Sequence, residues 1–499
     1  MLSGFRSLVR HTAVYGTGNL LGRAVSVVLL PLYVRRLTTE ENGVIVLAFA
    51  FIGFTAVFYS MGLNQALIRY LSIREDDRLL KLRLSTVFWT LLSAGGVLSW
   101  ALWFWASDVS LLLLDTRNHV DILQLIAVII FLDTLSEPLF SYLRARQRSS
   151  VFSGIRLVQH TLQIGLTVYL IAALDQGAKA VFISNVVSSA FALVAVGCTV
   201  VRQLSFIFSG HQLRRLLAFG IPFVPSALAL LAINLSDRFL VRHFLGLAEA
   251  GVYGVAYKLT VPMALIVRSF QSAWAPAVLA EARSEDTRAL CARVTTYVAL
   301  GGVGFFLLTA AVSGELIRLV SGANADTYFR GHSVVPVVTF AYVLYGLYIA
   351  LTAGIYVEAR TRVLPPIIAV GAGVNIWLNI YLLPRIGIEG AAWSTVGAYS
   401  LMTAALFIVA KRVYPVPYEI GRLIKVALVG GVCTLLIVNN LHNQSLTGLI
   451  ARLCFVAVYP FLLWGVGFFR AGEWDGVKSL LLRKAPDADT DGSNPPEIG

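Results

Sequence analysis

The feature that most limits what this chain can fold into is a series of apolar segments, each about as long as a bilayer is thick. A helix needs roughly 20 apolar residues to cross ~30 Å of hydrocarbon, and segments of that length follow one another through most of the 499 residues. Only 13% of the residues are charged, whereas soluble domains carry about 25%. The sequence therefore predicts an all-α polytopic membrane protein.

We count fourteen such segments, and a sequence pattern places their ends to within about two to four residues. The first follows Arg6 and Arg10, as the apolar part of a signal peptide would. It is too long for one and carries Arg23 in its middle, so we interpret it as a retained span. The predicted spans are 12–35, 43–67, 84–106, 120–142, 152–174, 178–201, 216–240, 251–273, 294–317, 334–356, 363–383, 388–410, 423–440 and 449–469.

The formal net charge is +13, but the basic residues lie between the apolar segments rather than in one patch. This distribution argues against a nucleic-acid partner. With a cytoplasmic N-terminus, the inner loops hold 26 Lys and Arg residues and the outer loops hold nine. The positive-inside rule then places both termini in the cytoplasm. The polar stretch 485–499 predicts a disordered cytoplasmic tail.

Two stretches of the first half recur about 210 residues later. RRLTTEENGV (35–44) aligns with HFLGLAEAGV (243–252), and ARQR (145–148) aligns with ARTR (359–362). The shared residues include glycines and polar residues at loop positions, where an apolar composition does not force a match. The pattern indicates two copies of a six-helix unit.

The repeat predicts the organisation of the whole chain. Residues 1–210 form an N-lobe of six helices, residues 211–412 form a C-lobe in the same orientation, and residues 413–484 hold two further helices. Parallel repeats of this kind are a transporter architecture, with the substrate path between two lobes that rock against each other.

Three stretches also carry a family resemblance: NLLGRAVSVVLLPLYVRRLTTEENGV, NLSDRFLVRHFLGLAEAGVYGVAYK and LRARQRS. Over about residues 10–410 the chain resembles the polysaccharide-transporter family of the multidrug/oligosaccharidyl-lipid/polysaccharide exporter superfamily. That family includes O-antigen flippases and is related to the lipid II flippases. The resemblance implies transport, not enzymatic activity: a polyprenyl-diphosphate-linked glycan crosses the bacterial plasma (inner) membrane by alternating access. It also implies membrane lipids, a polysaccharide polymerase and glycosyltransferases as partners.

Ionisable residues inside predicted spans are the candidate site residues, because each costs about 2.5–3.5 kcal/mol on insertion scales and so faces a cavity or a partner. Arg23, Lys258 and Arg268 could form a cationic cavity for a diphosphate headgroup. Asp133 and Glu137 share one helix face, and Arg23 could instead pair with either of them as a structural bridge. Arg268 could also extend to the interface.

A second group of polar residues lies in the outer third of three spans. Asp237, Asn375, Asn379 and Thr395 offer carboxylate, amide and hydroxyl oxygens, the ligands that a sodium ion favours. The lipid II flippases have a similar sodium site, with an Asp where this chain has Asn379. The lost charge weakens the case for sodium here, and the coupling ion could be Na⁺ or H⁺. We expect no other cofactor.

Two other interpretations of Asp237 stay open. Lys258 lies at comparable depth and could pair with Asp237 in place of an ion. Alternatively, Asp237 and Arg238 point about 100° apart on the helix, and Arg238 reaches the outer headgroups.

Two other functions compete with the flippase. A cation-coupled antiporter of drugs or metabolites would belong to the same superfamily, but those transporters typically have twelve helices and an acidic first helix. A membrane-embedded glycosyltransferase or polymerase would need substantial loops, and no predicted loop exceeds about 20 residues. The chain has no Walker motif for ATP hydrolysis.

Overall fold

The computed structural model describes residues 27–72, 77–281, 287–441 and 445–470. Within these ranges every regular element is a helix. The all-α prediction is therefore confirmed for the part of the chain that the structure describes.

The first half contains one short helix and then eight longer elements. Their bounds are α2 (Leu30–Arg36), α3 (Thr39–Ser60), α4 (Leu63–Ser72), α5 (Asp77–Phe104), α6 (Ala106–Leu114), α7 (Val120–Ala145), α8 (Ser149–Ala172), α9 (Lys179–Val200) and α10 (Gly210–Gly220).

The second half continues the same pattern. Its helices are α11 (Phe223–Leu245), α12 (Leu247–Leu259), α13 (Val261–Glu281), α14 (Thr287–Ser321), α15 (Ala325–Phe329), α16 (Val334–Val357), α17 (Leu364–Ile386), α18 (Ile388–Val413), α19 (Ile420–Asn439) and α20 (Leu446–Gly465).

Eleven segments of the described residues are long and apolar enough to cross a membrane. One of them, 71 residues from Thr287 to Val357, contains both α14 and α16. Helix α8 is 24 residues long but is not among the eleven, and most of the first predicted span lies outside the described residues. Each of these three differences adds one span to the eleven segments. The structure is therefore consistent with about fourteen membrane spans, as predicted.

Three predicted spans are each divided into two helices. Met61 adopts a left-handed conformation (φ 46°) and Gly62 follows at φ 70°, which separates α3 from α4. Pro222 lies between α10 and α11. Thr260 lies between α12 and α13. Hydropathy does not reveal these breaks, because the apolar character continues through them.

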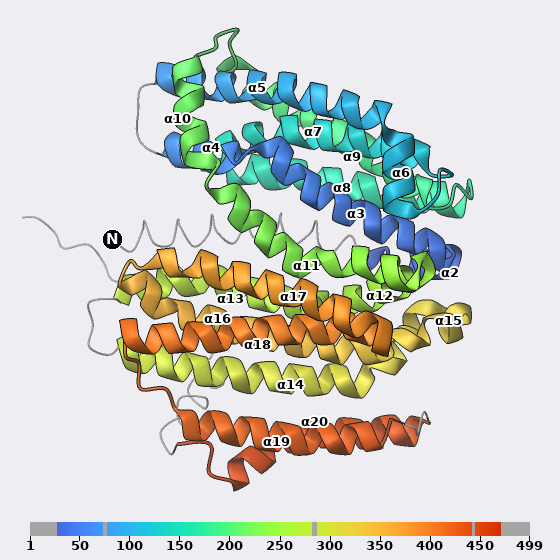
Figure 1. Ribbon diagram of the computed structural model, residues 1–499, viewed down its shortest axis with the longest axis vertical. Coiled ribbons are helices and arrows are strands. Elements are labelled where there is room, and N and C mark those ends of the chain that lie inside the picture. Colours follow the sequence, from blue (N-terminus) through green and yellow to red (C-terminus); the bar gives the residue numbers. More distant parts are fainter. Residues whose placement is uncertain (1–26, 73–76, 282–286, 442–444, 471–499) are drawn as a thin grey trace, which may run out of the picture.

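The helices form two groups with a small appendage (Figure 1). Helices α3 to α10 form the first helical group, which is uppermost, and α11 to α18 form the second helical group below it, with α11 and α12 facing the first group. Helices α19 and α20 lie against the far side of the second helical group, next to α14, where Arg452 donates to the Glu315 carboxylate at 2.5 Å. Separate apolar cores fill the two groups.

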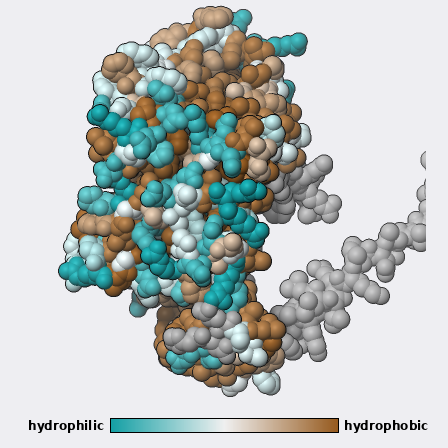
Figure 2. All heavy atoms as spheres, turned by 90° about the vertical axis from the view of Figure 1, so that its right-hand side faces the viewer, coloured by the Kyte–Doolittle hydropathy of each residue, from teal (hydrophilic) through white to brown (hydrophobic). Residues whose placement is uncertain are grey.

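The flanks of the bundle expose large apolar side chains, as a lipid-facing surface requires. Trp100, Trp377 and Trp464 are each more than 60% exposed. Figure 2 looks onto the end of the bundle near α2, α12 and α15, where hydrophilic residues cover the middle and hydrophobic residues gather toward the top and bottom. Together with the eleven apolar segments, this surface defines a multi-pass membrane protein.

At this end the two groups approach each other through their backbones. A Cβ added to Gly43 on α3 would lie 2.1 Å from the Leu247 carbonyl oxygen, and one added to Gly251 on α12 would lie 2.0 Å from the Thr39 carbonyl oxygen. The contact is reciprocal, because residues 39 and 43 correspond to 247 and 251 in the sequence repeat. The glycines of the repeat are therefore the residues that let α3 and α12 cross without a gap.

Replacing Gly43 or Gly251 with Ala should destabilise the purified protein by about 1–3 kcal/mol, the usual cost of overpacking, because backbone atoms cannot move aside as side chains can. Thermal unfolding in detergent measures this effect. Gly197→Ala on α9 is the control, since its Cβ would meet nothing within 4 Å. Equal unfolding temperatures for all three variants would contradict the close crossing.

Candidate functional site

The predicted cationic cavity is only partly within the described residues. Arg23 lies outside them. Lys258, at the end of α12, is partly buried, and its ammonium lies 5.1 Å from the centre of the Tyr33 ring on α2. Arg268 on α13 is exposed and acts electrostatically on Tyr345 and Tyr399. The grouping of these three cations into one cavity stays a prediction.

Asp237 is fully buried on α11 and forms an ion pair with its own neighbour. One carboxylate oxygen accepts from the Arg238 backbone N–H and from its guanidinium, each at 2.9 Å. The other accepts from the Tyr253 hydroxyl of α12 at 2.5 Å. The cation that neutralises Asp237 is therefore Arg238 rather than Lys258, and the expected divergence of Asp237 and Arg238 along the helix does not occur.

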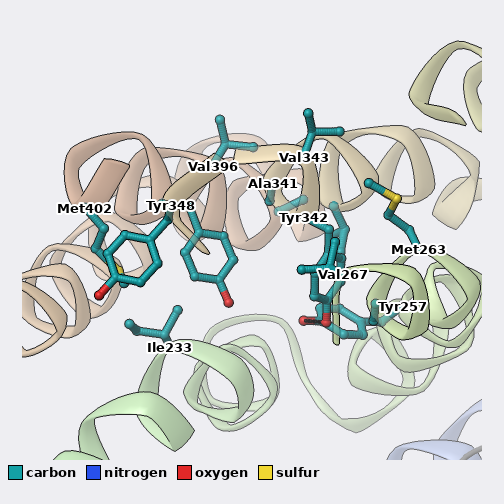
Figure 3. Close-up of a cluster of buried hydrophobic side chains, with 14 of the residues drawn as sticks. Ile233, Tyr257, Met263, Val267, Ala341, Tyr342, Val343, Tyr348, Val396 and Met402 are labelled. Atoms are coloured by element: carbon teal, nitrogen blue, oxygen red, sulfur yellow. Dashed lines mark hydrogen bonds between the residues drawn. The ribbon is translucent and has the colours of Figure 1, made fainter. Parts of the chain in front are cut away.

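Aromatic rings and a helix carbonyl hold Arg238 in this position. Its guanidinium donates to the Asn234 carbonyl and lies 4.4 Å from the centre of the Tyr257 ring. The hydroxyls of Tyr257 and Tyr342 are 3.1 Å apart, and Figure 3 shows these two side chains pointing toward each other between α12 and α16. The Asp237 and Arg238 side chains are only 0% and 12% exposed, so the ion pair is enclosed in the second helical group and Arg238 does not extend outward.

Asn375 and Asn379 lie together on α17, both fully buried. The Asn379 amide donates to the Asn375 backbone carbonyl at 2.9 Å and to its side-chain oxygen at 3.3 Å, and the Ser236 hydroxyl donates to that same oxygen at 3.4 Å. Thr395 on α18 donates to the Ala391 carbonyl at 3.2 Å. These residues offer neutral oxygens to an ion, while the carboxylate of Asp237 is engaged by α11 and α12.

In the first helical group, Glu137 on α7 binds two arginines. Arg156 of α8 donates to one carboxylate oxygen at 3.1 Å, and Arg144 approaches the other at 3.4 Å. Asp133, one turn away, interacts with Ser189 of α9. The structure thus joins Asp133 and Glu137 to α8 and α9; whether Arg23 also contacts them lies outside the described residues.

Sequence reasoning missed a second set of contacts between the two groups. Asn42 on α3 donates to the Tyr328 hydroxyl of α15 at 2.9 Å. Arg35 on α2 donates to the Leu319 and Val320 carbonyls at 2.7 and 3.1 Å. Arg35 and Asn42 both lie within the repeated motif RRLTTEENGV (35–44), and this position was the one sequence signal of a role. Both contacts lie at the same end as the glycine crossing, so this end of the two groups is tied by several bonds.

A bundle of about fourteen membrane spans in two groups, with ion pairs within each group, is typical of a secondary transporter. The solved structures that share this fold include a lipid II flippase and a multidrug resistance transporter. A lipid II flippase, MurJ, in an inward closed conformation is 13% identical, with a TM-score of 0.73 over 90% of this chain and 98% of that chain. An inward-facing multidrug resistance transporter of the MATE family is 14% identical, with a TM-score of 0.61 over 78% and 94%.

Sequence comparison identifies the family. Residues 32–328 match the model described as polysaccharide biosynthesis protein, and this chain belongs to that family. The uncharacterized membrane protein YabM of Bacillus subtilis (strain 168) is 25% identical over 210 residues, or 40% of this chain. The match spans 39% of that relative's length.

Asp237→Asn should lower the stability of the protein by about 3–5 kcal/mol, because the buried Arg238 loses its carboxylate. The double variant Asp237→Asn with Arg238→Met should recover part of that loss, as measured by thermal unfolding. Asp115→Asn is the control, since Asp115 is 86% exposed where it meets Arg242 and a surface pair contributes about 0–1 kcal/mol. Similar losses in Asp115→Asn and Asp237→Asn would contradict the buried pair.

Exchange of sodium for potassium should leave the unfolding temperature unchanged, because protein groups already occupy both oxygens of Asp237. The measurement is thermal unfolding in matched chloride salts at equal ionic strength. A rise specific to sodium that Asn379→Ala abolishes would instead establish an ion site on α17.

Proposed function

We propose that this protein moves a polyprenyl-diphosphate-linked oligosaccharide from the inner to the outer leaflet of a bacterial plasma membrane. It does so by alternating access, as a step in the synthesis of a surface polysaccharide. The protein acts as a transporter rather than as an enzyme, and both of its termini lie in the cytoplasm.

The observation that carries the proposal is the reciprocal glycine crossing of α3 and α12. It joins equivalent positions of two repeated units at one end of the bundle, where Arg35 and Asn42 add bonds between the groups. We take the moving bodies as the predicted N-lobe (residues 1–210) and C-lobe (residues 211–412), except that α10 (Gly210–Gly220) moves with the N-lobe, against which it packs. The positive-inside rule puts the crossing at the extracytoplasmic end, so the lobes are closed to the outside.

The charges favour an anionic substrate. Asp237 is already neutralised by Arg238, and no carboxylate of the described residues lies within salt-bridge distance of Lys258. Arg268 is exposed on α13, and Arg23 adds a further cation to the first span. A diphosphate that crosses an apolar barrier needs such positive charge, whereas a cationic drug would be repelled by it. This difference favours the flippase over the antiporter.

The family description, polysaccharide biosynthesis, supports a glycan substrate, and the fold shared with a lipid II flippase supports a lipid-linked one. The connections between the described helices are short, which disfavours a catalytic domain of a glycosyltransferase or polymerase. Such enzymes are instead the partners that supply and consume the transported glycan.

Arg23→Ala and Lys258→Met should each reduce surface polysaccharide at least about tenfold in a strain that depends on this chain, because the diphosphate loses a charged partner worth about 1.5–3 kcal/mol. Immunoblots against the protein verify equal expression. Arg117→Ala is the control, because Arg117 lies in an exposed ion pair with Asp108. Normal polysaccharide in both variants would remove these residues from the mechanism.

A further inference from the structure

A cavity of about 130 Å³ lies within the second helical group, apart from the Asp237 ion pair. It is bounded by α11, α13, α16, α17 and α18, and its wall combines aromatic, amide and aliphatic side chains. Gln271 and Trp274 come from α13, and Tyr345, Tyr348 and Tyr356 come from α16. The cavity therefore lies among all five of these helices.

One polar group in this wall has no protein partner. Tyr348 is 5% exposed, and its hydroxyl is a buried atom without a hydrogen bond. In Figure 3 Tyr348 lies near Met402 and Ile233. A buried hydroxyl without a partner is unfavourable, so the site calls for a ligand or water that can hydrogen-bond there. Gln271 is exposed and supplies an amide at the edge of the same cavity.

The wall also carries aromatic rings, which lie among aliphatic side chains such as Leu230, Ile368 and Met402. Tyr345 stacks on Tyr348 at 6.0 Å between ring centres and on Tyr399 at 4.9 Å. Trp274 donates its indole N–H to the Ala350 carbonyl at 3.2 Å, which fixes the orientation of its ring. A ligand with one apolar C–H face and a rim of hydroxyl groups matches flat rings flanked by a free hydroxyl and an amide. A sugar ring has this construction.

The electrostatics argue against an organic cation in the same place. The described residues that line the cavity include no Asp or Glu. Arg268, three residues before Gln271 on α13, acts on Tyr345 and Tyr399 in or beside the wall. Positive charge at the edge and neutral polar groups inside suit an uncharged, hydroxyl-rich ligand.

We propose that this cavity is a sugar-binding subsite, which holds one monosaccharide ring of the lipid-linked glycan. Tyr348 supplies the hydroxyl that discriminates among sugars, Gln271 supplies a second polar contact, and Trp274 supplies the stacking face. The assignment rests on the proposed flippase function and deepens it, because it gives the C-lobe a direct part in recognition of the glycan.

The test is saturation-transfer NMR on the full chain in lipid nanodiscs, with glucose, galactose, rhamnose and N-acetylglucosamine as separate probes. At least one sugar should bind, and Tyr348→Phe should weaken it about three- to tenfold, because it removes one hydrogen bond and little volume. Gln271→Ala should weaken the same sugar. Tyr169→Phe is the matched control, since Tyr169 on α8 is 56% exposed.

Two results would overturn the assignment. The first is absence of binding by every sugar to the folded wild-type protein, which would leave water as the occupant. The second is binding of rhodamine 6G that Tyr348→Phe weakens while no sugar competes, which would make the cavity a site for organic cations. Complementation of a flippase-deficient strain by the wild-type chain, measured in parallel, separates failure of this inference from failure of the proposed function.

Discussion

The rest of the architecture depends on a close approach of two backbones. At Gly43 and Gly251 the helices α3 and α12 come so near that a single Cβ would meet a carbonyl oxygen. Side chains would hold the two groups apart at this end, and the bonds made by Asn42 and Arg35 would then be out of reach. A contact built from glycines buries little apolar side-chain surface. It can therefore close one end of the bundle, and separating the two helices again costs little free energy.

The charged side chains of the two helical groups divide into those that are paired within the protein and those that stay available to a ligand. Asp237 is paired with Arg238 and Tyr253, and Glu137 is paired with Arg156 and Arg144. Breaking the Asp237–Arg238 pair would leave an unpaired charge in a low dielectric, so this pair opposes rearrangement of α11 against α12. Lys258 and Arg268 form no ion pair among the described residues. In the proposed function, the substrate path uses these cations and leaves the structural ion pairs intact.

The sequence predicted the fold well and the candidate site in part. Hydropathy placed the limits of α16, α17 and α18 to within three residues, and the aligned glycines marked the crossing of α3 and α12. Hydropathy could not reveal the breaks at Met61 and Pro222.

The pairing of Asp237 with Arg238 was not predicted, because adjacent helical positions point about 100° apart and only the coordinates show that the long arginine side chain folds back. The cavity beside Tyr348 joins five helices far apart in sequence, so no local pattern could indicate it.

The central claim is that the two groups are separate bodies that close and open at the α3–α12 end. Its most direct test is pulsed electron paramagnetic resonance between spin labels at Asn118→Cys and Thr327→Cys, two exposed positions at this end on different groups, in a background without the native cysteines. The account predicts a short distance that gives way to a second, longer population when a lipid-linked glycan is added. A single distance that neither the glycan nor Gly251→Leu changes would contradict it.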